Sequence, residues 1–512
     1  MNSETVVHHY NRLMEKIKAI MLLQSTTEIM NWDMETKMPP RGLTLRSEQL
    51  ALLSGLEHKM ITDQNIGNLL GKIEGHRDYK SLTVTQQRNV YLIQKDYAEQ
   101  TKLPETLVIN TAKQRAIAID TWKKAKNARN FSRFKPEFEK LLNMRKKAAE
   151  ILMDVKQTPT PYDALLDIYE PKMTTERVTT LFNKLKEGLI SVLEKCEAAT
   201  KQPNSSILQR KVPLEIQQKI TYELVKFLGY DIESENANGR IDETEHPFTT
   251  GYYNDVRITT HYCENKMSTS LFSILHESGH ALYEQHLNPD WIYRPIGAAA
   301  SLGFHESQSR LIENIIGRSH AFWAYFFPKL TELTGSIFSD VNLDTFVFAI
   351  NQVNPSKIRV EADEVTYGLH IIIRFEIERD LMEGKITVAE LPEVWNQKYK
   401  DYLNIDIAHD AEGVLQDIHW ASGSIGYFPT YALGNILSGQ ILDQMRKHIP
   451  DWRSQISQGY FHSIGKWLGE NVHRYGNLYD PDELIKKISG EEINIAYYLN
   501  YLNDKFAQLY EF

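Results

Sequence analysis

The chain has 512 residues, of which 42% are hydrophobic and 24% are charged, as is typical of a soluble globular protein. Its net charge of −9 argues against a nucleic-acid partner, because phosphate binding requires a basic surface. No stretch approaches the roughly 20 apolar residues that span a bilayer, and the apolar run 19–23 is too short for a signal peptide. There are only two cysteines, Cys196 and Cys263, so we expect a cytoplasmic protein with no membrane partner.

The first third of the chain is predicted to be a series of helices. Apolar and charged residues recur with helical spacing over 4–26, 43–61, 84–100, 106–128 and 131–158. Pro39, Pro40 and Gly42 cannot continue a helix, so we expect a turn over 31–42. The short Pro-rich segment 158–162 lacks the composition of a linker, which indicates a loop inside one body.

The middle of the chain contains a segment with strand character. After helical patterns at 174–201 and 213–228, the segment 246–264 concentrates β-branched and aromatic residues, which predicts one or two short strands or a hairpin. Helical patterns return over 271–286, 298–316, 320–334, 343–353, 361–383 and 388–403. A Gly- and aromatic-rich region at 413–434 and further helices complete the chain. The sequence therefore predicts a mainly α fold that forms one integrated body over 1–512.

Residues 276–280, His-Glu-Ser-Gly-His, match the His-Glu-x-x-His pattern of zinc peptidases. Residues four apart lie on one face of a helix, so His276 and His280 can offer two imidazole nitrogens to one metal ion. Glu277 lies about 100° further round the helix and would flank the ion, where a base for an attacking water is needed. The pattern predicts a metallopeptidase.

Catalytic zinc usually has three protein ligands and one open position, so two histidines leave this predicted site one ligand short. The candidates are carboxylates on the next predicted helix: Glu306 stands out, and Glu313, two turns later, is the alternative. From spacing alone, Glu306 is equally well explained as a solvated helix carboxylate. Two histidines and a carboxylate suit Zn2+, although Co2+ or Mn2+ can occupy such sites.

Further motifs resemble those of the carboxypeptidase Taq family of metallocarboxypeptidases. They occur, in order, at 246–248 (HPF), 255–259 (DxRxT), 276–284 (HESGHALYE), 305–309 (HESQS), 358–363 (IRVEAD) and 413–420 (GxxQDxHW). Segments 32–40 and 426–434 are similar to the family as well. These motifs extend from the first helices to beyond residue 430, so the resemblance covers nearly the whole chain.

The resemblance implies a mostly helical glutamate-zincin fold, with two lobes flanking a deep substrate groove and a metal-site segment at about 246–320. It implies one divalent ion bound by His276, His280 and Glu306, with Glu277 as general base and acid. The implied reaction is the release of single amino acids from peptide C-termini, with broad specificity and poor tolerance of a C-terminal proline. The resemblance also implies a homodimer.

An exopeptidase must recognise a free C-terminal carboxylate, for which a fixed guanidinium is the natural group. By resemblance Arg359 is the first choice, and a structural ion pair with Glu361 or Asp363 is the alternative. Tyr431 is expected to hydrogen-bond the substrate or the tetrahedral intermediate. Tyr427 is the alternative to Tyr431, and either ring is also compatible with simple packing.

Three further substrate contacts are proposed on the motifs. His419 is a plausible oxyanion or substrate donor. Arg257 is expected either to contact the peptide or to pair with Asp255 two positions away on a strand. His246 precedes a proline and is more simply explained as a positioned loop residue than as a ligand. The resemblance implies that the motifs of His246 and Arg257 line the groove and limit what binds there.

Two other functions are compatible with the predicted metal centre. An oligopeptidase would cut internal bonds with the same ion and would not need Arg359 for its substrates. A non-catalytic peptide-binding protein would use the metal structurally, but a structural zinc site is normally closed by four protein ligands, and Glu277 is intact.

Overall fold

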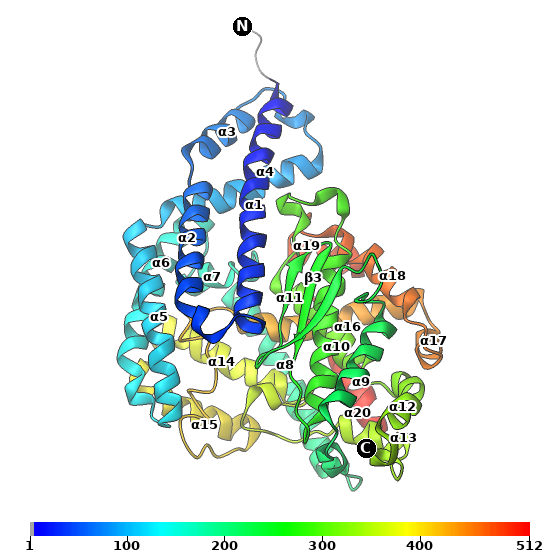
Figure 1. Cartoon of the computed structure of the whole chain (residues 1–512). Coiled ribbons are helices and arrows are strands. Elements are labelled where there is room, and N and C mark those ends of the chain that lie inside the picture. Colours follow the sequence, from blue (N-terminus) through cyan, green and yellow to red (C-terminus); the bar gives the residue numbers. More distant parts are fainter. Residues whose placement is uncertain (1–4) are drawn as a thin grey trace.

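The computed structural model describes residues 5–512 and consists mostly of helices around one small sheet (Figure 1). The helices of the first half are α1 (Val6–Thr36), α2 (Leu43–Ile61), α3 (Gln64–Glu74), α4 (Val84–Lys102), α5 (Glu105–Asn127), α6 (Lys135–Lys156), α7 (Pro161–Leu166), α8 (Thr175–Ala198) and α9 (Leu214–Leu228). The strands β1 (Gly239–Glu243), β2 (Thr249–Tyr252) and β3 (Asp255–Thr260) follow.

The second half of the chain is again helical. Its helices are α10 (Met267–Gln285), α11 (Leu302–Arg310), α12 (His320–Thr334), α13 (Leu343–Ile350), α14 (Tyr367–Met382), α15 (Leu391–Leu403), α16 (Pro429–His448), α17 (Trp452–Ser457), α18 (His462–Asn471), α19 (Pro481–Ser489) and α20 (Ala496–Tyr510). No helix within residues 5–512 is long and apolar enough to cross a membrane.

Buried apolar side chains form two large clusters and one small one. The α14 core is built mainly from α5–α8, α14, α15 and α20, and the α10 core mainly from the sheet, α9–α13 and α17–α19. A small third cluster joins α1, α3 and α4, which lie in the upper part of Figure 1. Helix α16 lies between the two large cores: Leu433 and Ile436 belong to the α14 core, whereas Leu437 and Ile441 belong to the α10 core.

The sheet has the strand order β1-β3-β2, with β1 parallel and β2 antiparallel to β3. Its central strand buries Val256 and Ile258 in the α10 core, and α10 packs against β2 and β3. In this register Thr249 of the outer strand β2 lies opposite Ile258. The arrangement places β2 beside the helix that carries the His-Glu-x-x-His pattern.

The predicted fold class is confirmed, since the chain is mainly α and a hairpin directly precedes α10. Several boundaries were wrong. Strand β1 and helix α3 were not predicted, and α1 continues through Thr36 into the predicted turn. Helix α11 begins only at Leu302, because the Ser301 hydroxyl caps it by accepting the Phe304 N–H. Helix α14 begins at Tyr367 instead of residue 361.

Candidate active site

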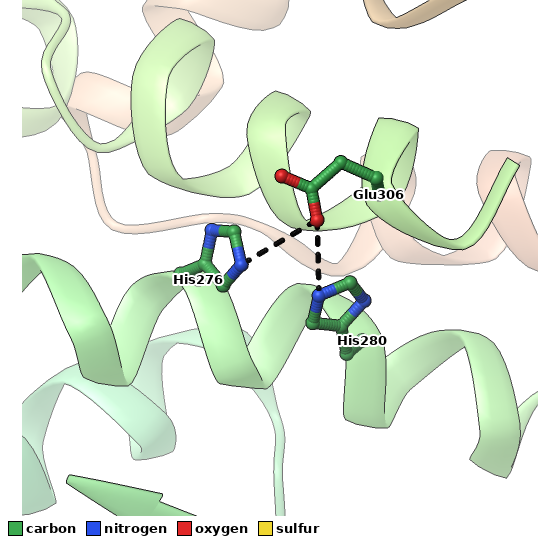
Figure 2. A group of neighbouring side chains, drawn as sticks. All are labelled: His276, His280 and Glu306. Carbon is green, nitrogen blue, oxygen red and sulfur yellow. Dashed lines mark ion pairs between the residues drawn. The ribbon is translucent and has the colours of Figure 1, made fainter. Parts of the chain in front are cut away.

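Helices α10 and α11 bring three potential metal ligands together (Figure 2). His276 and His280 lie one turn apart on α10 and face Glu306 on α11, with ligand atoms within 4.8 Å of one another. Glu306 Oε2 is 3.7 Å from His276 Nε2 and 3.4 Å from His280 Nε2. A tetrahedral ion with bonds of about 2.0–2.2 Å separates its ligand atoms by about 3.4 Å, so this donor set fits a zinc-like ion.

The two helices run antiparallel, because His276 contacts Glu313 near the end of the second segment, whereas Glu284 contacts His305 near its start. The antiparallel packing explains how Glu306, which follows α10 by one loop, comes to lie beside both histidines. The predicted association of Glu306 with the two histidines is therefore seen in the structure.

Two glycines allow the backbones around the metal ligands to approach closely. A Cβ at Gly279 would lie 2.5 Å from the Gln308 carbonyl oxygen and 2.6 Å from Ser309 Cα on α11. A Cβ at Gly434 on α16 would lie 2.6 Å from Cγ of Glu306. Real Cβ atoms do not come so close to other heavy atoms, so α10 packs against Gln308 and Ser309, and α16 against Glu306, only because these positions lack side chains.

Glu313, the alternative third ligand, contacts the far side of His276. Its Oε2 is 2.9 Å from His276 Nδ1, whereas Nε2 of the same ring faces Glu306. Arg310 and Arg318 also contact the Glu313 carboxylate, each at 3.3 Å. Burial would raise the pKa of Glu313, but Arg310 and His276 outweigh it and lower the pKa to about 2. Glu313 is thus an ionised acceptor that can hold the Nδ1–H of His276.

His280 has a different neighbour on its far side. Its Nδ1 is 2.6 Å from Nδ1 of His305, and His305 Nε2 is 2.8 Å from Glu284 Oε1. Burial lowers the pKa of His280 to about 3, which favours a neutral ring able to bind a metal.

Arg310 anchors the third ligand. Its Nε donates a 2.6 Å hydrogen bond to Glu306 Oε1, the oxygen that does not face the histidines. Burial would raise the pKa of Glu306, but the positive charge of Arg310 holds it below its ordinary value. Glu306 is therefore ionised, as a metal ligand must be.

Glu277 is buried beside the sheet, and its carboxylate contacts strand β2, whereas His276 and His280 face Glu306. The Thr249 hydroxyl on β2 is 2.6 Å from Glu277 Oε2, and no hydrogen bond to Oε1 is found among residues 5–512. Burial raises the pKa of Glu277 above its ordinary value. Strand β2 thus orients one carboxylate oxygen and leaves the other free to accept a proton.

Arg359 lies in a short 3-10 turn (Arg359–Glu361) and is buried on the side of the α14 core. Its Nε donates to Asp417 at 2.9 Å and its Nη1 donates to the Tyr367 hydroxyl at 3.2 Å. The same Asp417 carboxylate accepts a 2.7 Å bond from the fully buried Arg374. The alternative interpretation of Arg359, a structural ion pair with Glu361 or Asp363, is therefore not what the described chain shows, because its partner is Asp417. Glu361 pairs with Lys266, while Asp363 accepts hydrogen bonds from the backbone N–H and the hydroxyl of Thr366, just before α14.

Two arginines share one carboxylate here, so this cluster carries a net charge of +1. Burial would raise the pKa of Asp417, but Arg359 and Arg374 lower it strongly, so the carboxylate is ionised. Nη2 of Arg359 makes no hydrogen bond within the described chain, and the Tyr431 ring lies 5.1 Å from the guanidinium. The excess charge and the open nitrogen suit an incoming anion.

His419, Tyr427 and Tyr431 form an aromatic group beside Arg359. His419 Nε2 is 3.2 Å from the Tyr431 hydroxyl, while the buried His419 Nδ1 has no hydrogen-bond partner within residues 5–512. Burial lowers the pKa of His419 to about 4 and raises that of Tyr431, so the imidazole and the phenol are both neutral at pH 7. Tyr427 packs 5.3 Å from Tyr431 and 5.4 Å from His419, measured between ring centroids.

The remaining predicted substrate residues lie on the sheet side. Arg257 pairs with Asp255 through bonds of 2.7 and 2.8 Å, which is one of the two interpretations given for Arg257. Its guanidinium also stacks on the Trp32 ring at 4.3 Å. His246 is exposed in the loop between β1 and β2, without a hydrogen bond or ion pair within the described chain. The structure does not bring either residue into the three-ligand group.

Arg310 and Tyr367 connect the three potential metal ligands to the arginine cluster. The Arg310 guanidinium lies 4.2 Å above the ring of Tyr367, the residue whose hydroxyl accepts from Arg359. Glu306, Arg310, Tyr367 and Arg359 therefore form a continuous series of contacts. A group of residues that could hold a metal ion therefore lies next to a cluster with excess positive charge, as would suit a peptidase acting at chain ends.

Comparison with known proteins gives the same assignment. The family model for carboxypeptidase Taq (M32) metallopeptidases matches residues 12–506. The chain belongs to this family. It is 38% identical over 506 residues to carboxypeptidase 1 of Bacillus subtilis, covering 98% of this chain and 99% of that protein. It is also 38% identical over 508 residues to thermostable carboxypeptidase 1 of Thermus thermophilus, covering 98% and 99%.

Solved structures of carboxypeptidases share the whole fold. An M32 carboxypeptidase from Deinococcus radiodurans superposes with a TM-score of 0.94 at 34% identity, covering 98% of this chain and 100% of that chain. Pyrococcus furiosus carboxypeptidase superposes with a TM-score of 0.93 at 33% identity, covering 99% and 100%. The chain is a metal-dependent carboxypeptidase, a hydrolase of peptide bonds at the C-terminal end.

Several residues that organise the site of this carboxypeptidase were not predicted from the sequence. Thr249, Glu284 and Arg374 lie 28, 21 and 43 residues along the chain from the residues they hold, so no spacing rule connects them. Tyr367 lies only 8 residues after Arg359, but Arg359 belongs to a short 3-10 turn and Tyr367 to the start of α14. Gly279 had a signal, since a glycine inside an apolar helix often marks a close approach of another backbone.

Proposed function

We propose that His276, His280 and Glu306 hold a catalytic Zn2+ ion, for which Co2+ or Mn2+ are substitutes. The proposal is supported by the ligand spacing and by the ionised state of Glu306. Such an ion, when bound, supplies Lewis-acid chemistry that lowers the pKa of a water and polarises the scissile carbonyl.

Glu277 is the proposed general base and acid. The Thr249 hydroxyl fixes Oε2, so Oε1 accepts a proton from the attacking water and delivers it to the leaving amine. A carboxyl group whose pKa is raised by burial is suited to both steps, since it holds the proton more firmly than an exposed glutamate. Removing this group is expected to lower turnover by about 10²–10⁴-fold.

Arg359 is proposed to bind the C-terminal carboxylate of the peptide, which makes the enzyme an exopeptidase of broad side-chain specificity. Asp417 and Tyr367 fix the guanidinium and leave Nη2 open, and Arg374 supplies the excess positive charge. Because this recognition concerns the carboxylate alone, it does not select among side chains. The net positive, buried cluster next to the metal ligands is the observation that carries this assignment.

Tyr431 is proposed to donate its phenol hydrogen to the oxygen on which negative charge develops during attack, and His419 to orient the phenol. Tyr427 packs against both rings and is the alternative donor. Arg257 and His246 are proposed to line the substrate path near the sheet, although the present partner of Arg257 is Asp255.

The experiment that tests this proposal compares one short peptide with a free C-terminus and the same peptide with a C-terminal amide. We expect the free peptide to lose residues one at a time, and the amide to be cleaved at least about 100-fold more slowly. Chelation should abolish both reactions and Zn2+ should restore them. Rapid internal cleavage of the amide would instead identify an oligopeptidase. Unchanged hydrolysis by the Glu277→Gln variant would exclude the catalytic assignment altogether.

We also propose an organisation for the enzyme as a whole. The two large cores on either side of α16 support one integrated body over 1–512 whose lobes flank a substrate groove, with the metal-site segment at about 246–320. A cytoplasmic homodimer follows from the composition and the family resemblance. Light scattering of the purified enzyme would give a mass near twice 59.3 kDa if the dimer forms.

A further inference from the structure

The two histidine ligands are supported in different ways. Nδ1 of His276 faces a carboxylate, Glu313 Oε2, at 2.9 Å. Nδ1 of His280 faces another imidazole, His305 Nδ1, at 2.6 Å, and the carboxylate of Glu284 lies beyond that second ring. Metal-bound histidines usually donate their second N–H directly to a carboxylate or carbonyl, so an intervening imidazole needs an explanation.

The positions of the protons follow from the contacts. His280 offers Nε2 to the ion, so a neutral His280 carries its proton on Nδ1 and donates it to His305 Nδ1. A neutral His305 must then carry its proton on Nε2, and this N–H donates to Glu284 Oε1 at 2.8 Å. With both rings neutral, no other assignment leaves Nε2 of His280 free and satisfies both short contacts.

The second ring is held by packing as well as by hydrogen bonds. His305 lies between His280 and Tyr283, with ring centroids at 4.6 and 5.3 Å, and its side chain is only 19% exposed. His305 projects from α11, one residue before Glu306. The helix that supplies Glu306 therefore also supports His280.

We infer that His305 is a positioning residue that fixes the tautomer and the ring orientation of His280, and that Glu284 fixes the tautomer of His305. The inference rests on the proposed role of His280 as a metal ligand. His305 does not contact the ion or the substrate. Its effect is to present Nε2 of His280 to the ion as a lone pair in a fixed direction.

Two variants of similar shape test this inference. In His305→Asn, the amide oxygen stands near the place of Nδ1 and can still accept the His280 proton. In His305→Leu, the side chain has a similar volume but no acceptor. We expect the affinity for Zn2+, measured on the full-length apoenzyme by competition with a chromophoric chelator, to fall 10- to 100-fold in His305→Leu. In His305→Asn it should stay within about threefold of the parent value.

A spectrum provides a second measurement that does not depend on turnover. The visible absorption bands of the Co2+-substituted enzyme report ligand geometry, and we expect them to shift in His305→Leu and to keep the parent pattern in His305→Asn. Glu284→Leu should weaken Zn2+ binding by only a fewfold. It no longer fixes the proton of His305 on Nε2, but it keeps His305 Nδ1 as an acceptor for His280. His320→Leu is the matched control, since His320 is exposed and, among residues 5–512, pairs only with Asp344.

The possible results separate this inference from the proposed metal site. Parent-like affinity and spectrum in His305→Leu would overturn it. Equal losses in the Asn and Leu variants would also overturn it, because packing alone would then explain the effect. A His280→Ala variant that binds Zn2+ normally would disprove the ligand assignment itself. Circular dichroism melts of each apoenzyme identify any variant that fails to fold. If His305→Leu does not fold, Zn2+ affinity is compared between Glu284→Leu and the parent instead.

Discussion

The proposed metal ligands and the proposed carboxylate-binding arginine are held in place by different kinds of interaction. His276, His280 and Glu306 project from two packed helices of the α10 core, and close contact between the helix backbones sets their spacing. Arg359 lies in a short turn beside the α14 core, and its position depends on a buried ion pair with Asp417. Geometry on the metal side is thus set by backbone packing, whereas geometry on the carboxylate side is set by charge.

This difference predicts how each side fails. A side chain that separates α10 from α11 moves Glu306 away from both histidines at once, because the three residues are held by the packing of these two helices. A substitution in a charge cluster removes one contact and leaves its neighbours in place if another cation balances the buried anion. Arg374 provides that balance at Asp417. Disruption of the metal side should therefore abolish the reaction, while disruption of the carboxylate side should alter which substrates are accepted.

The largest effect is expected for Gly279→Ala. The new methyl group would lie 2.5 Å from the Gln308 carbonyl oxygen, so α10 and α11 must separate and the ligands move apart. A shift of about 1 Å is enough to lower turnover about 100-fold or more. Turnover and Zn2+ affinity should fall together when both are measured on the same preparation.

Gly55→Ala is the matched control for that substitution. Gly55 lies on α2 with no heavy atom within 4 Å of an added Cβ, and no positive φ is involved. This variant should keep full activity and gain about 0.5–1 kcal/mol in free energy of unfolding, since alanine is the better helix former. If Gly279→Ala behaved in the same way, close helix contact would not be what sets the ligand geometry.

The next largest effect is expected for Arg359→Gln. Loss of a charged hydrogen bond to the substrate carboxylate should lower kcat/KM for a free peptide about 10- to 100-fold, mainly through KM. The slow reaction with an amidated peptide should hardly change, so the preference for free over amidated ends should collapse. Zn2+ affinity should remain at the parent value.

Arg359→Lys sharpens that result. Lysine keeps the charge but lacks the planar fork that Asp417 and Tyr367 hold in place. We expect only partial recovery of kcat/KM for the free peptide. A variant that loses Zn2+ affinity along with peptide preference would show that the two sides are one structural unit after all.

These two sides also differ in what their sequence reveals. His276 and His280 are four residues apart, and helix periodicity alone places them on one face. Glu306 follows after one loop, where an antiparallel neighbour could return it to the histidines, but spacing alone left Glu313 open as the alternative. Arg359 and Asp417 are 58 residues apart in irregular segments, and no periodicity relates them. Only family resemblance pointed to Arg359, and the alternative ion pair considered for it involved Glu361 or Asp363 instead of Asp417.

The fold shows the same limit. Long helices with clear periodicity were predicted, because the apolar face of a helix repeats within a few residues. Strand β1 was missed, because it is identified as a strand by its pairing with β3, which its local sequence does not display. The start of α11 was missed because it depends on the Ser301 cap and on the carboxylate of Glu170, which comes from a distant loop. Long-range contacts, which a single sequence does not display, decide these boundaries.

A smaller effect, about tenfold in kcat, is expected for removing the phenol hydroxyl that stabilises developing charge. Tyr431→Phe should show it and Tyr427→Phe should not, because His419 contacts the hydroxyl of Tyr431 and only the ring of Tyr427. Pre-steady-state measurement of the cleavage step would separate this loss from changes in binding. The reverse pattern would assign the donor role to Tyr427 and leave Tyr431 as a packing residue.

The smallest effect concerns a carboxylate that ties the two cores together. Glu170 belongs to the loop after α7 and accepts hydrogen bonds from Ser301 Oγ at 2.8 Å and Gly303 N at 3.0 Å, at the start of α11. Burial raises the pKa of Glu170 from 4.5 to about 7. The folded protein therefore binds more protons than the unfolded chain between these values, and stability falls as the pH rises from about 4.5 to about 7.

Over this pH range the free energy of unfolding should fall by about 3 kcal/mol. For a chain of this length, that corresponds to a melting temperature lower by about 3 °C. Glu170→Gln removes the titrating group, so its melting temperature should fall less between pH 5 and pH 8 than that of the parent. Thermal melts of both proteins at the two pH values measure this difference directly. Equal pH dependence would mean that Glu170 is ionised in the folded state throughout, and that the tie between the cores is a charged hydrogen bond to the N-terminus of α11.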